Sequence, residues 1–368
     1  MNFFKRYLLP ALIWLSVAAY IAVAARITHA RLAESVVGSV DIDIVDSTAD
    51  RRLVTNAMVR EWIHKSGIST IGVPLRDVNC SDIEDLITRN GFVSKAVVYT
   101  ASNGRLYIKV GQRQPALRLL TAGYDRYCTE RGFIFGTPAA STVYVPVLTG
   151  GYVPPFPANY EGRARTYTDS IIYGHKGIAA HIAELQKERI ALRKSVAAKY
   201  KEIDEQPKIY KFKRHLLESA DIRAKRKEAL DKQKKEAVAA LESEIRTLYR
   251  KIDDTDRYIS DQRAQIKKAE KKYEDFVKLI NFVRKIEEDS FWRSEIVQIT
   301  VDTTPAGAMN IALVPRSGSF VIEFGELENV DSKLDKLLRF YREGLKNIGW
   351  DLYATVNVAY DNQVVCRK

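Results

Sequence analysis

The sequence predicts an α+β protein with an N-terminal transmembrane helix, a small domain in the order β-α-α-β-β, and a mixed β domain interrupted by a long antiparallel coiled-coil hairpin. Three observations lead to this prediction: an uncharged run near the N-terminus, two groups of short strand-like runs, and a charged helical repeat between parts of the second group. The chain has 368 residues, of which 46% are hydrophobic. That length suits two or three domains with substantial cores.

Residues 7–25 form the predicted transmembrane helix. They carry no charge, and Lys5-Arg6 and Arg26 flank them. About 19 or 20 helical residues span the hydrocarbon core of a bilayer. The short tail, residues 1–6, favours a cytoplasmic N-terminus, with the bulk of the chain outside the cytoplasm. A cleaved signal peptide is the alternative, because Ala22-Val23-Ala24 is similar to a cleavage site.

Residues 37–115 form the predicted β-α-α-β-β domain. Apolar and polar residues alternate in Val40–Ile44, which is typical of a half-buried strand. Two helices follow, one with Val54, Met58, Trp62 and Ile63 on one face, and one that Ser81 caps and that carries Ile83, Leu86 and Ile87. Asn103-Gly104 joins the last two predicted strands, Val93–Thr100 and Arg105–Val110, as a hairpin turn.

This segment resembles the POTRA domain, a small module used at protein–protein contacts in bacterial envelopes. The resemblance rests on Gly72-x-Pro74-Leu75, Arg89–Val93, Ala96-Val97-Val98, Leu106–Val110 and an exit motif, Gln112-Arg113-Gln114-Pro115. Gly91 departs from the family pattern, which has proline at that position.

Residues 116–158 and 289–368 are the two parts of the predicted β domain. The first part contains the strand-like runs Ala116–Leu120, Tyr127–Phe135 and Val143–Gly150. The second part contains strands at Ile296–Val301, Asn310–Val314, Phe320–Phe324, Tyr353–Val358 and Tyr360–Cys366, with an amphipathic helix from Asp331 to Lys346. Val145–Gly150 and the ending, which includes Lys333–Tyr341 and Gly349–Lys368, resemble the FtsQ (DivIB) cell division family, and the ending is similar to its Bacteroidetes members.

Residues 159–288 form the predicted coiled-coil insertion. Residues 161–290 hold 32 lysines and arginines and 24 aspartates and glutamates, and Pro207 is the one proline between Ile178 and Glu288. Two sets of residues step alternately by four and three positions, which is the spacing of a coiled-coil seam. They are Ile178, Ile182, Leu185, Arg189, Leu192, Val196, Lys199 and Ile203, and then Leu241, Ile245, Leu248, Ile252, Thr255, Ile259, Gln262, Ile266, Ala269, Tyr273, Phe276 and Ile280.

Because both ends of the insertion must return to one sheet, we expect an antiparallel hairpin with its tip between Gln206 and Ile222. The charge is first of all that of a solvated helix exterior, and binding to an anionic surface or an acidic partner is the alternative. The chain has a net charge of +12, but nucleic acid is not an expected partner for a hairpin outside the cytoplasm.

The sequence offers no catalytic or metal-binding motif. It has no nucleotide-binding glycine loop, no GxSxG and no HExxH. Five histidines lack metal-ligand spacing, so we expect no enzyme, no cofactor, no metal and no small-molecule substrate. The three cysteines, Cys80, Cys128 and Cys366, form no CxxC pair, and a bridge between Cys80 and Cys128 stays open.

The resemblance to FtsQ implies a scaffold in the inner membrane at the division septum. Its partners would be FtsB/DivIC-like and FtsL-like proteins, with FtsW/FtsI-like proteins as further candidates. The implied contact is the last strand, in which we expect Tyr360, Asn362, Val364 and Cys366 on one face and Gln363 and Val365 on the other. The alternative function is a periplasmic adaptor of a secretion or efflux system, although Trp292–Glu295 after the hairpin lacks the lipoyl half-motif of such adaptors.

Overall fold

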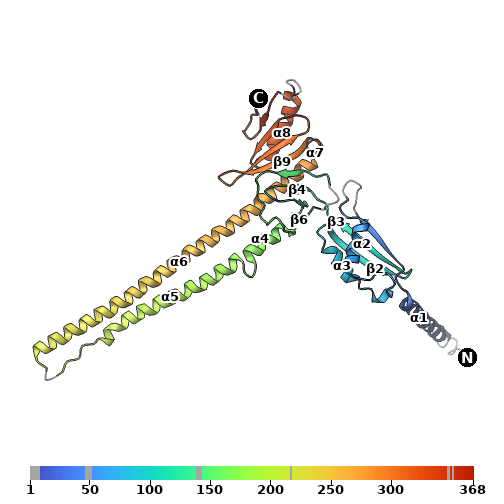
Figure 1. Ribbon diagram of the computed structural model, residues 1–368. Coiled ribbons are helices and arrows are strands. Elements are labelled where there is room, and N and C mark those ends of the chain that lie inside the picture. Colours follow the sequence, from blue (N-terminus) through green and yellow to red (C-terminus); the bar gives the residue numbers. More distant parts are fainter. Residues whose placement is uncertain (1–8, 46–51, 138–142, 216–217, 346–348, 350–351) are drawn as a thin grey trace. The chain divides into compact units, whose positions relative to one another are not determined.

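The computed structural model describes residues 9–45, 52–137, 143–215, 218–345, 349 and 352–368. The chain divides into two compact units (Figure 1). The first comprises Met1–Val153, Pro157–Arg163 and Val277–Lys368, and the second comprises Pro154–Phe156 and Ala164–Phe276. Each unit is described separately below.

Helix α1 spans Leu9–Glu34 at the start of the first unit. The side chains of Leu12, Trp14 and Leu15 are 65%, 73% and 72% exposed. The predicted tail, residues 1–6, and the first two residues of the predicted membrane span, Tyr7 and Leu8, lie outside the described residues. Across the described ranges, no helix is both long enough and apolar enough to cross a membrane.

A three-stranded sheet with two helices on one face follows α1, in the predicted order β-α-α-β-β (Figure 1). Strand β3 lies in the centre, parallel to β1 and antiparallel to β2. Buried residues of α2, α3 and the sheet pack into one core. The elements are β1 Ser39–Val45, α2 Asn56–Lys65, the short 3-10 helix η3 Leu75–Asp77, α3 Cys80–Thr88, β2 Val93–Ala101 and β3 Arg105–Gln112.

Two local predictions in this domain were wrong. Asn79, not Ser81, caps α3, because its side-chain oxygen accepts the backbone N–H of Asp82 at 3.3 Å. A cap must precede the first helical residue, and Ser81 is the second residue of α3. The buried face of α2 consists of Val59 and Ile63, since Val54 lies before the helix and contributes to the core from the preceding segment.

The β domain is a ten-stranded sheet in the order β13-β12-β11-β10-β9-β7-β4-β5-β6-β8. Most of its strands are short, and its two halves come from segments before and after the hairpin. The strands are β4 Leu117–Leu119, β5 Arg126–Cys128, β6 Phe133–Gly136, β7 Val147–Thr149, β8 Gly162–Arg163, β9 Ile296–Thr303, β10 Met309–Pro315, β11 Val321–Gly325, β12 Thr355–Asn357 and β13 Val365–Arg367.

The two halves of this sheet join where β7 pairs in parallel with β9. The hydroxyls of Thr149 and Thr300 lie 3.2 Å apart, and the backbone N–H of Gly151 donates to Asp302 Oδ1 at 2.7 Å. Gly150, between Thr149 and Gly151, has a φ of 103°, and a Cβ at this position would overlap the carbonyl oxygen of Val301. Glycine is therefore required both by its dihedral angle and by the close approach of β9.

Helices surround the C-terminal part of the sheet. The last turns of α6, from Val277 onward, belong to the first unit, and the ring of Phe282 lies 5.0 Å from that of Phe324 on β11. Helix α7, Ser290–Glu295, leads into β9. Helix α8, Val330–Arg339, continues as a π-helical segment, Phe340–Leu345, so the predicted amphipathic helix is present, while its predicted last residue, Lys346, lies outside the described residues.

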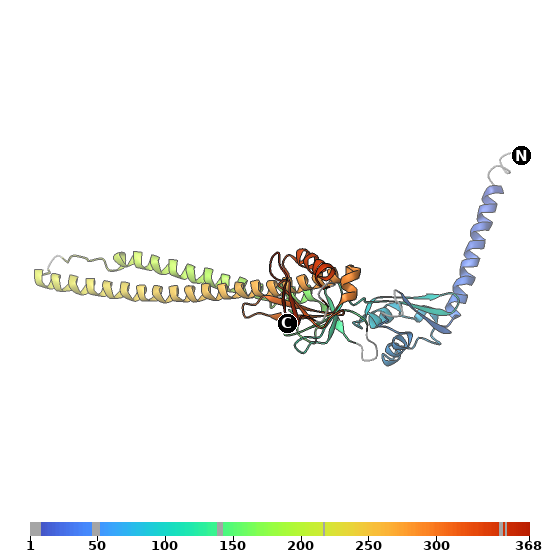
Figure 2. The same cartoon turned by 90° about the horizontal axis from the view of Figure 1, so that it is seen from above.

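The second unit contains Pro154–Phe156, α4, Ala164–Tyr173, and α5, Ile178–Ile209. It also contains the long helix α6, Ala220–Glu288, as far as Phe276. Helices α5 and α6 lie side by side in both views (Figures 1 and 2). They are antiparallel, since ion pairs join Arg189 to Asp256 and Lys199 to Glu244. The connection between them, residues 210–219, falls within the predicted tip.

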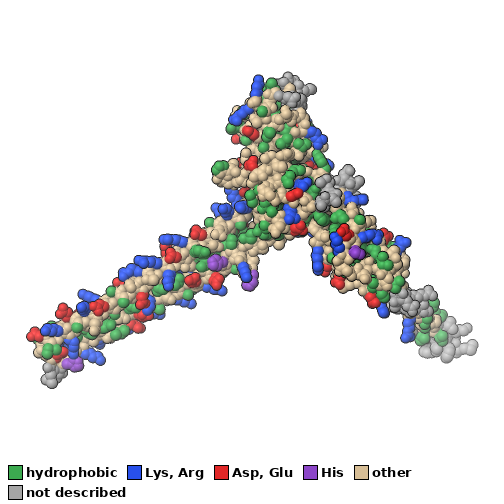
Figure 3. All heavy atoms as spheres, viewed as in Figure 1, with side chains coloured by type: hydrophobic (Ala, Val, Ile, Leu, Met, Phe, Trp, Pro, Cys, Tyr) green, Lys and Arg blue, Asp and Glu red, His purple; other side chains and the backbone are tan. Residues whose placement is uncertain are grey.

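The predicted seam positions are the less exposed side of both helices. Val196, Ile245 and Ile252 form a buried cluster, and Leu192, Ile203 and Leu248 pack against it. Arg189 and Lys199 occupy seam positions without destabilising the hairpin, because each meets a carboxylate of α6. Charges of both signs cover the outer surface along the two helices (Figure 3).

We predict that Gly150→Ala lowers the free energy of unfolding by roughly 2–4 kcal/mol, through backbone strain and overlap with β9. Gly307→Ala is the matched control, because Gly307 also has a positive φ, 81°, but no atom lies within 4 Å of the added Cβ. Chemical denaturation of both variants measures the difference. Equal losses of unfolding free energy in the two variants would show that the close approach of β7 and β9 does not require a glycine at position 150.

Candidate protein-interaction site

Strand β13 is the last strand at one edge of the ten-stranded sheet. It pairs in antiparallel fashion with β12, with Cys366 opposite Val356. In the described part of the chain, no strand pairs with its other side. Its outer edge can therefore accept an additional strand from a partner.

The predicted strand Tyr360–Cys366 is shorter in the structure, and this prediction was wrong in extent. Of the predicted site residues, Val365 and Cys366 lie in β13, whereas Tyr360, Asn362, Gln363 and Val364 precede it. The chain turns at Tyr360–Asn362, and Asn362 has a left-handed φ of 56°. Asparagine tolerates this conformation better than most residues, so the turn breaks the expected alternation of faces.

Three of the predicted residues instead line a groove beside β13. Asn362, Gln363 and Val364 form one wall, and the outer face of α8 with its π-helical extension forms the other. The groove has a volume of about 830 Å³. Its second wall consists of Ser332, Asp335, Lys336, Arg339, Phe340, Glu343 and Gly344.

One lysine of α8, Lys336, contacts the C-terminal turn, and a second, Lys333, contacts residues that precede α8. The Lys336 ammonium donates a hydrogen bond to the backbone carbonyl of Tyr360. Lys333 donates to the carbonyl of Glu326 at 2.7 Å and lies over the ring of Phe324. Burial lowers the pKa of Lys336, and Asp361 opposes that shift. The groove is therefore a built feature whose two walls are joined at its base.

A second set of contacts holds β12, the strand that pairs with β13, in place. The Asn357 amide donates to Glu323 Oε2 at 2.5 Å, and Asn357 Oδ1 accepts the backbone N–H of Ala359 at 2.9 Å. Gly325, with a φ of 77°, ends β11 where a Cβ would press on Ala359. These contacts attach the end of β12 to the neighbouring strand.

No specific signal in the sequence predicts the α8 wall of this groove. The polar face of an amphipathic helix ordinarily faces solvent, and the pattern alone does not say which other segment lies beside it. The proximity of α8 to the final turn depends on the lysine contacts described above, which are long-range in sequence.

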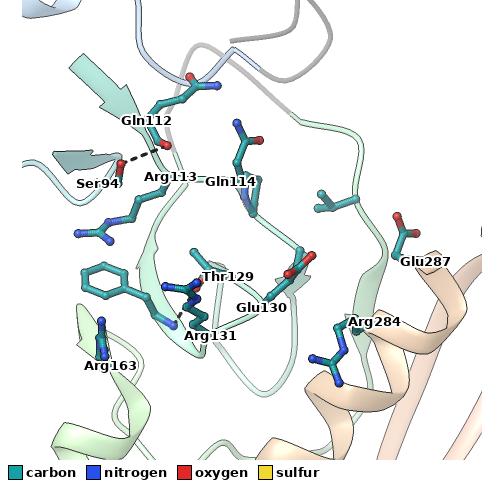
Figure 4. Close-up of a pocket in the computed structure, with 14 residues that line it drawn as sticks. Ser94, Gln112, Arg113, Gln114, Thr129, Glu130, Arg131, Arg163, Arg284 and Glu287 are labelled. Carbon is teal, nitrogen blue, oxygen red and sulfur yellow. Dashed lines mark hydrogen bonds between the residues drawn. The ribbon is translucent and has the colours of Figure 1, made fainter. Parts of the chain in front are cut away.

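A second cavity, of about 570 Å³, lies where the exit motif leads into the β domain (Figure 4). Arg113 joins the two domains there. Its Nε donates to the carbonyl of Gly91 at 2.9 Å, and its guanidinium carbon lies 3.4 Å from the centre of the Phe133 ring. Burial and the nearby charge of Arg163 lower the pKa of Arg113. The contacts with Gly91 and Phe133 therefore offset an unfavourable environment for the guanidinium charge.

Gln112 completes this junction from the other side. Its side-chain oxygen accepts the backbone N–H groups of Leu53 and Val54 at 3.0 and 3.3 Å. The side chain is buried, so both donors would otherwise lack a partner in a dry core. The exit motif therefore closes the first domain with Gln112 and contacts the second with Arg113.

The described residues contain no group of three histidine, cysteine, aspartate or glutamate side chains that could hold a metal ion. Cys80, Cys128 and Cys366 are free thiols. Burial raises the pKa of Cys128, which keeps this thiol protonated and unreactive.

We predict that Arg113→Gln lowers the free energy of unfolding by about 1–3 kcal/mol, because it removes the ring contact and the bond to Gly91. Arg131→Gln, an exposed residue of the same cavity, is the control and should change it by less than about 0.5 kcal/mol. Thermal or urea unfolding provides the readout. Similar effects of both substitutions would contradict a joining role for Arg113.

Two family models match the chain. The model described as POTRA-like domain matches residues 35–111, and the model described as FtsQ/DivIB, C-terminal related, matches residues 243–367. The second match begins within α6, so it includes part of the hairpin as well as β9–β13. No curated protein matches the chain. Both matched families are non-enzymatic scaffold types, and the FtsQ/DivIB family interacts with other proteins of the division machinery. The two matches, in this order along one chain, support an FtsQ/DivIB-family protein.

Proposed function

We propose that this protein is a membrane-anchored scaffold of the bacterial divisome. It binds FtsB/DivIC-like and FtsL-like proteins and positions them at the septum. It carries out no reaction itself. The observation that carries this proposal is the outer edge of β13, which ends the sheet beside a groove.

The mode of binding is strand addition. A partner segment beside β13 gains backbone hydrogen bonds, and the groove beside α8 receives side chains that project from it. Lys336, Arg339, Asp335 and Glu343 give the groove both signs of charge. A segment with a matching charge pattern is preferred, since unpaired charges at an interface disfavour other partners.

The POTRA-like domain offers a second contact surface, for which FtsW/FtsI-like proteins are candidates. Its helices cover one face of the sheet, and apolar side chains of β2 remain exposed. The Tyr99 and Tyr107 rings stack with centres 5.2 Å apart, and Val97 and Tyr99 are 37% and 39% exposed. Exposed aromatic residues on a rigid sheet are typical of protein interfaces.

The proposed membrane anchor is the uncharged run of residues 7–25, which begins before the first described residue and continues into α1, with the C-terminal bulk in the periplasm. Its support is the lack of charge in this run and the exposure of the apolar side chains of α1. Residues such as Leu12, Trp14 and Leu15 would bury their surface in lipid. Trp14 and Tyr20 are tolerated within or near the bilayer interface.

The anchor is tested with Ala18→Arg/Ala19→Arg. Each arginine at the centre of a membrane helix costs about 2.5–3.5 kcal/mol of insertion free energy. We expect the full-length protein to stay in the membrane pellet after a carbonate wash and the double variant to leave it. Ala18→Leu/Ala19→Leu is the control and should remain in the pellet. Retention of the arginine variant would exclude α1 as the anchor.

Strand addition is tested with Val365→Pro and Cys366→Pro in the full-length chain. Alternate residues of an antiparallel strand direct their N–H groups to opposite sides. One substitution therefore removes a bond to β12, and the other removes a donor on the free edge. We expect one variant to lose stability, and the other to stay folded but bind the partners' extracytoplasmic segments at least about tenfold more weakly, roughly 1.4 kcal/mol.

Arg367→Ala is the side-chain control, because it leaves both backbone edges of β13 intact. Its effect on partner affinity should be less than about threefold, as is usual for a rim charge. The measurement is titration of labelled FtsB/DivIC-like and FtsL-like segments, with thermal unfolding as the check of folding. Unchanged affinity in the stable proline variant would exclude pairing along β13.

A further inference from the structure

Positive charge is concentrated at the distal end of the hairpin. We call residues 207–215 and 218–235 the distal segment, and the other residues of 161–290 the shaft. The distal segment holds 11 lysines and arginines but only four aspartates and glutamates. The shaft holds 21 and 20 of these residues, so it is almost neutral. The distal segment therefore accounts for +7 of the net charge of +8 in this region.

Two of the distal cations stabilise the end of the hairpin itself. Arg226 forms an ion pair with Glu218 at 3.1 Å, donates to the carbonyl of Lys213 at 2.5 Å and lies over the Phe212 ring. Arg223 donates to the carbonyl of Glu218 at 2.7 Å. These contacts attach Phe212, Lys213 and Glu218 to the beginning of α6.

Eight further cations of the distal segment are exposed. Within the residues that the structure describes, none of them forms an ion pair. In the shaft, Arg189 and Lys199 bridge the two helices and Arg257 pairs with Asp253. The shaft differs from the distal segment chiefly in its nearly equal numbers of positive and negative residues. The eight exposed cations are Lys208, Lys211, Lys213, Arg214, Lys225, Lys227, Lys232 and Lys235.

Apolar side chains stand among these cations. Ile209 ends α5 and is 66% exposed, and Ile222 lies in the first turn of α6 and is 61% exposed. A solvated helix end that only needs solubility gains nothing from exposed isoleucines. Basic residues around exposed apolar side chains are typical of segments that lie in the headgroup region of a membrane.

We propose that the distal segment docks on an anionic phospholipid surface. Its cations bind lipid phosphates, and Ile209 and Ile222 enter the boundary between headgroups and acyl chains. Each lysine or arginine near such a surface contributes about 1 kcal/mol, and the contribution decays within the Debye length of about 8 Å at physiological salt. A compact group of eight cations can therefore act together, whereas alternating charges along the shaft cancel.

The favoured surface is lipid rather than a soluble acidic protein. An acidic protein would form ion pairs with the cations, but a purely acidic surface would offer no apolar contact to Ile209 and Ile222. The inference does not depend on the edge-strand function, because the distal segment belongs to the second unit and β13 to the first.

The test uses the full-length chain in phosphatidylcholine nanodiscs, mixed with sedimentable vesicles. We expect vesicles with 30 mol% phosphatidylglycerol to bind at least about 100-fold more strongly than pure phosphatidylcholine vesicles at low salt. Lys225→Glu/Lys227→Glu/Lys232→Glu/Lys235→Glu should lose this preference. The matched control is Lys187→Glu/Lys194→Glu/Lys268→Glu/Lys271→Glu, which makes the same charge change at exposed shaft positions and should weaken binding by less than about fivefold.

Ile209→Ser/Ile222→Ser distinguishes a lipid surface from an acidic protein. Binding to the anionic vesicles should fall about tenfold, because two side chains no longer enter the lipid. Circular dichroism checks that all variants keep their helices. Equal binding to both vesicle types, or equal losses in the distal and shaft variants, overturns the proposal. Full binding by the serine variant, with displacement by soluble polyglutamate, assigns the segment to an acidic protein instead.

Discussion

The parallel pairing of β7 with β9 is the contact that the rest of the first unit depends on. Strand β7 ends at Thr149 and β9 begins at Ile296, so this pairing joins segments separated by the whole hairpin. The two strands can approach because Gly150 has no side chain, and Gln298 donates to the Thr149 hydroxyl at 2.8 Å across the joint. Strands β4–β8 and β9–β13 would otherwise be two small sheets with one more exposed edge each.

The same pairing determines what the insertion can be. A chain that leaves the sheet after β8 and returns before β9 must reverse its direction, and two antiparallel helices do this with few loop residues. The seam residues then bury each other, so most of the insertion's stability comes from packing between α5 and α6. An insertion of this kind can be long without disturbing the sheet, since its own core supports it.

The sequence predicted those parts of the fold that depend on local pattern. Alternation located β1, and the Asn103-Gly104 turn between strand-like runs located the hairpin of β2 and β3. The four-three spacing located the faces of α5 and α6 that carry Val196 and Ile252. It failed where one residue changes the course of the chain. Asn362 turns the segment before β13, and no periodic signal distinguishes that turn from a continuing strand. The groove beside α8 could not be predicted from the sequence either. Lys336 contacts the carbonyl of Tyr360 only in the folded chain, because the two residues are 24 positions apart.

The short length of β13 has a consequence for how a partner is selected. A strand of three residues offers few backbone hydrogen bonds, and Arg367 and Lys368 add charge at its end. Such short, charged edges discourage unspecific strand addition, which protects the protein from aggregation. Backbone pairing alone is therefore too weak to choose a partner, and side-chain contacts must supply the rest. The groove that Asn362, Gln363 and Val364 line with residues of α8 lies beside this edge. For the strand addition proposed above, β13 would set the direction of the partner segment, and we propose that the groove supplies the selectivity.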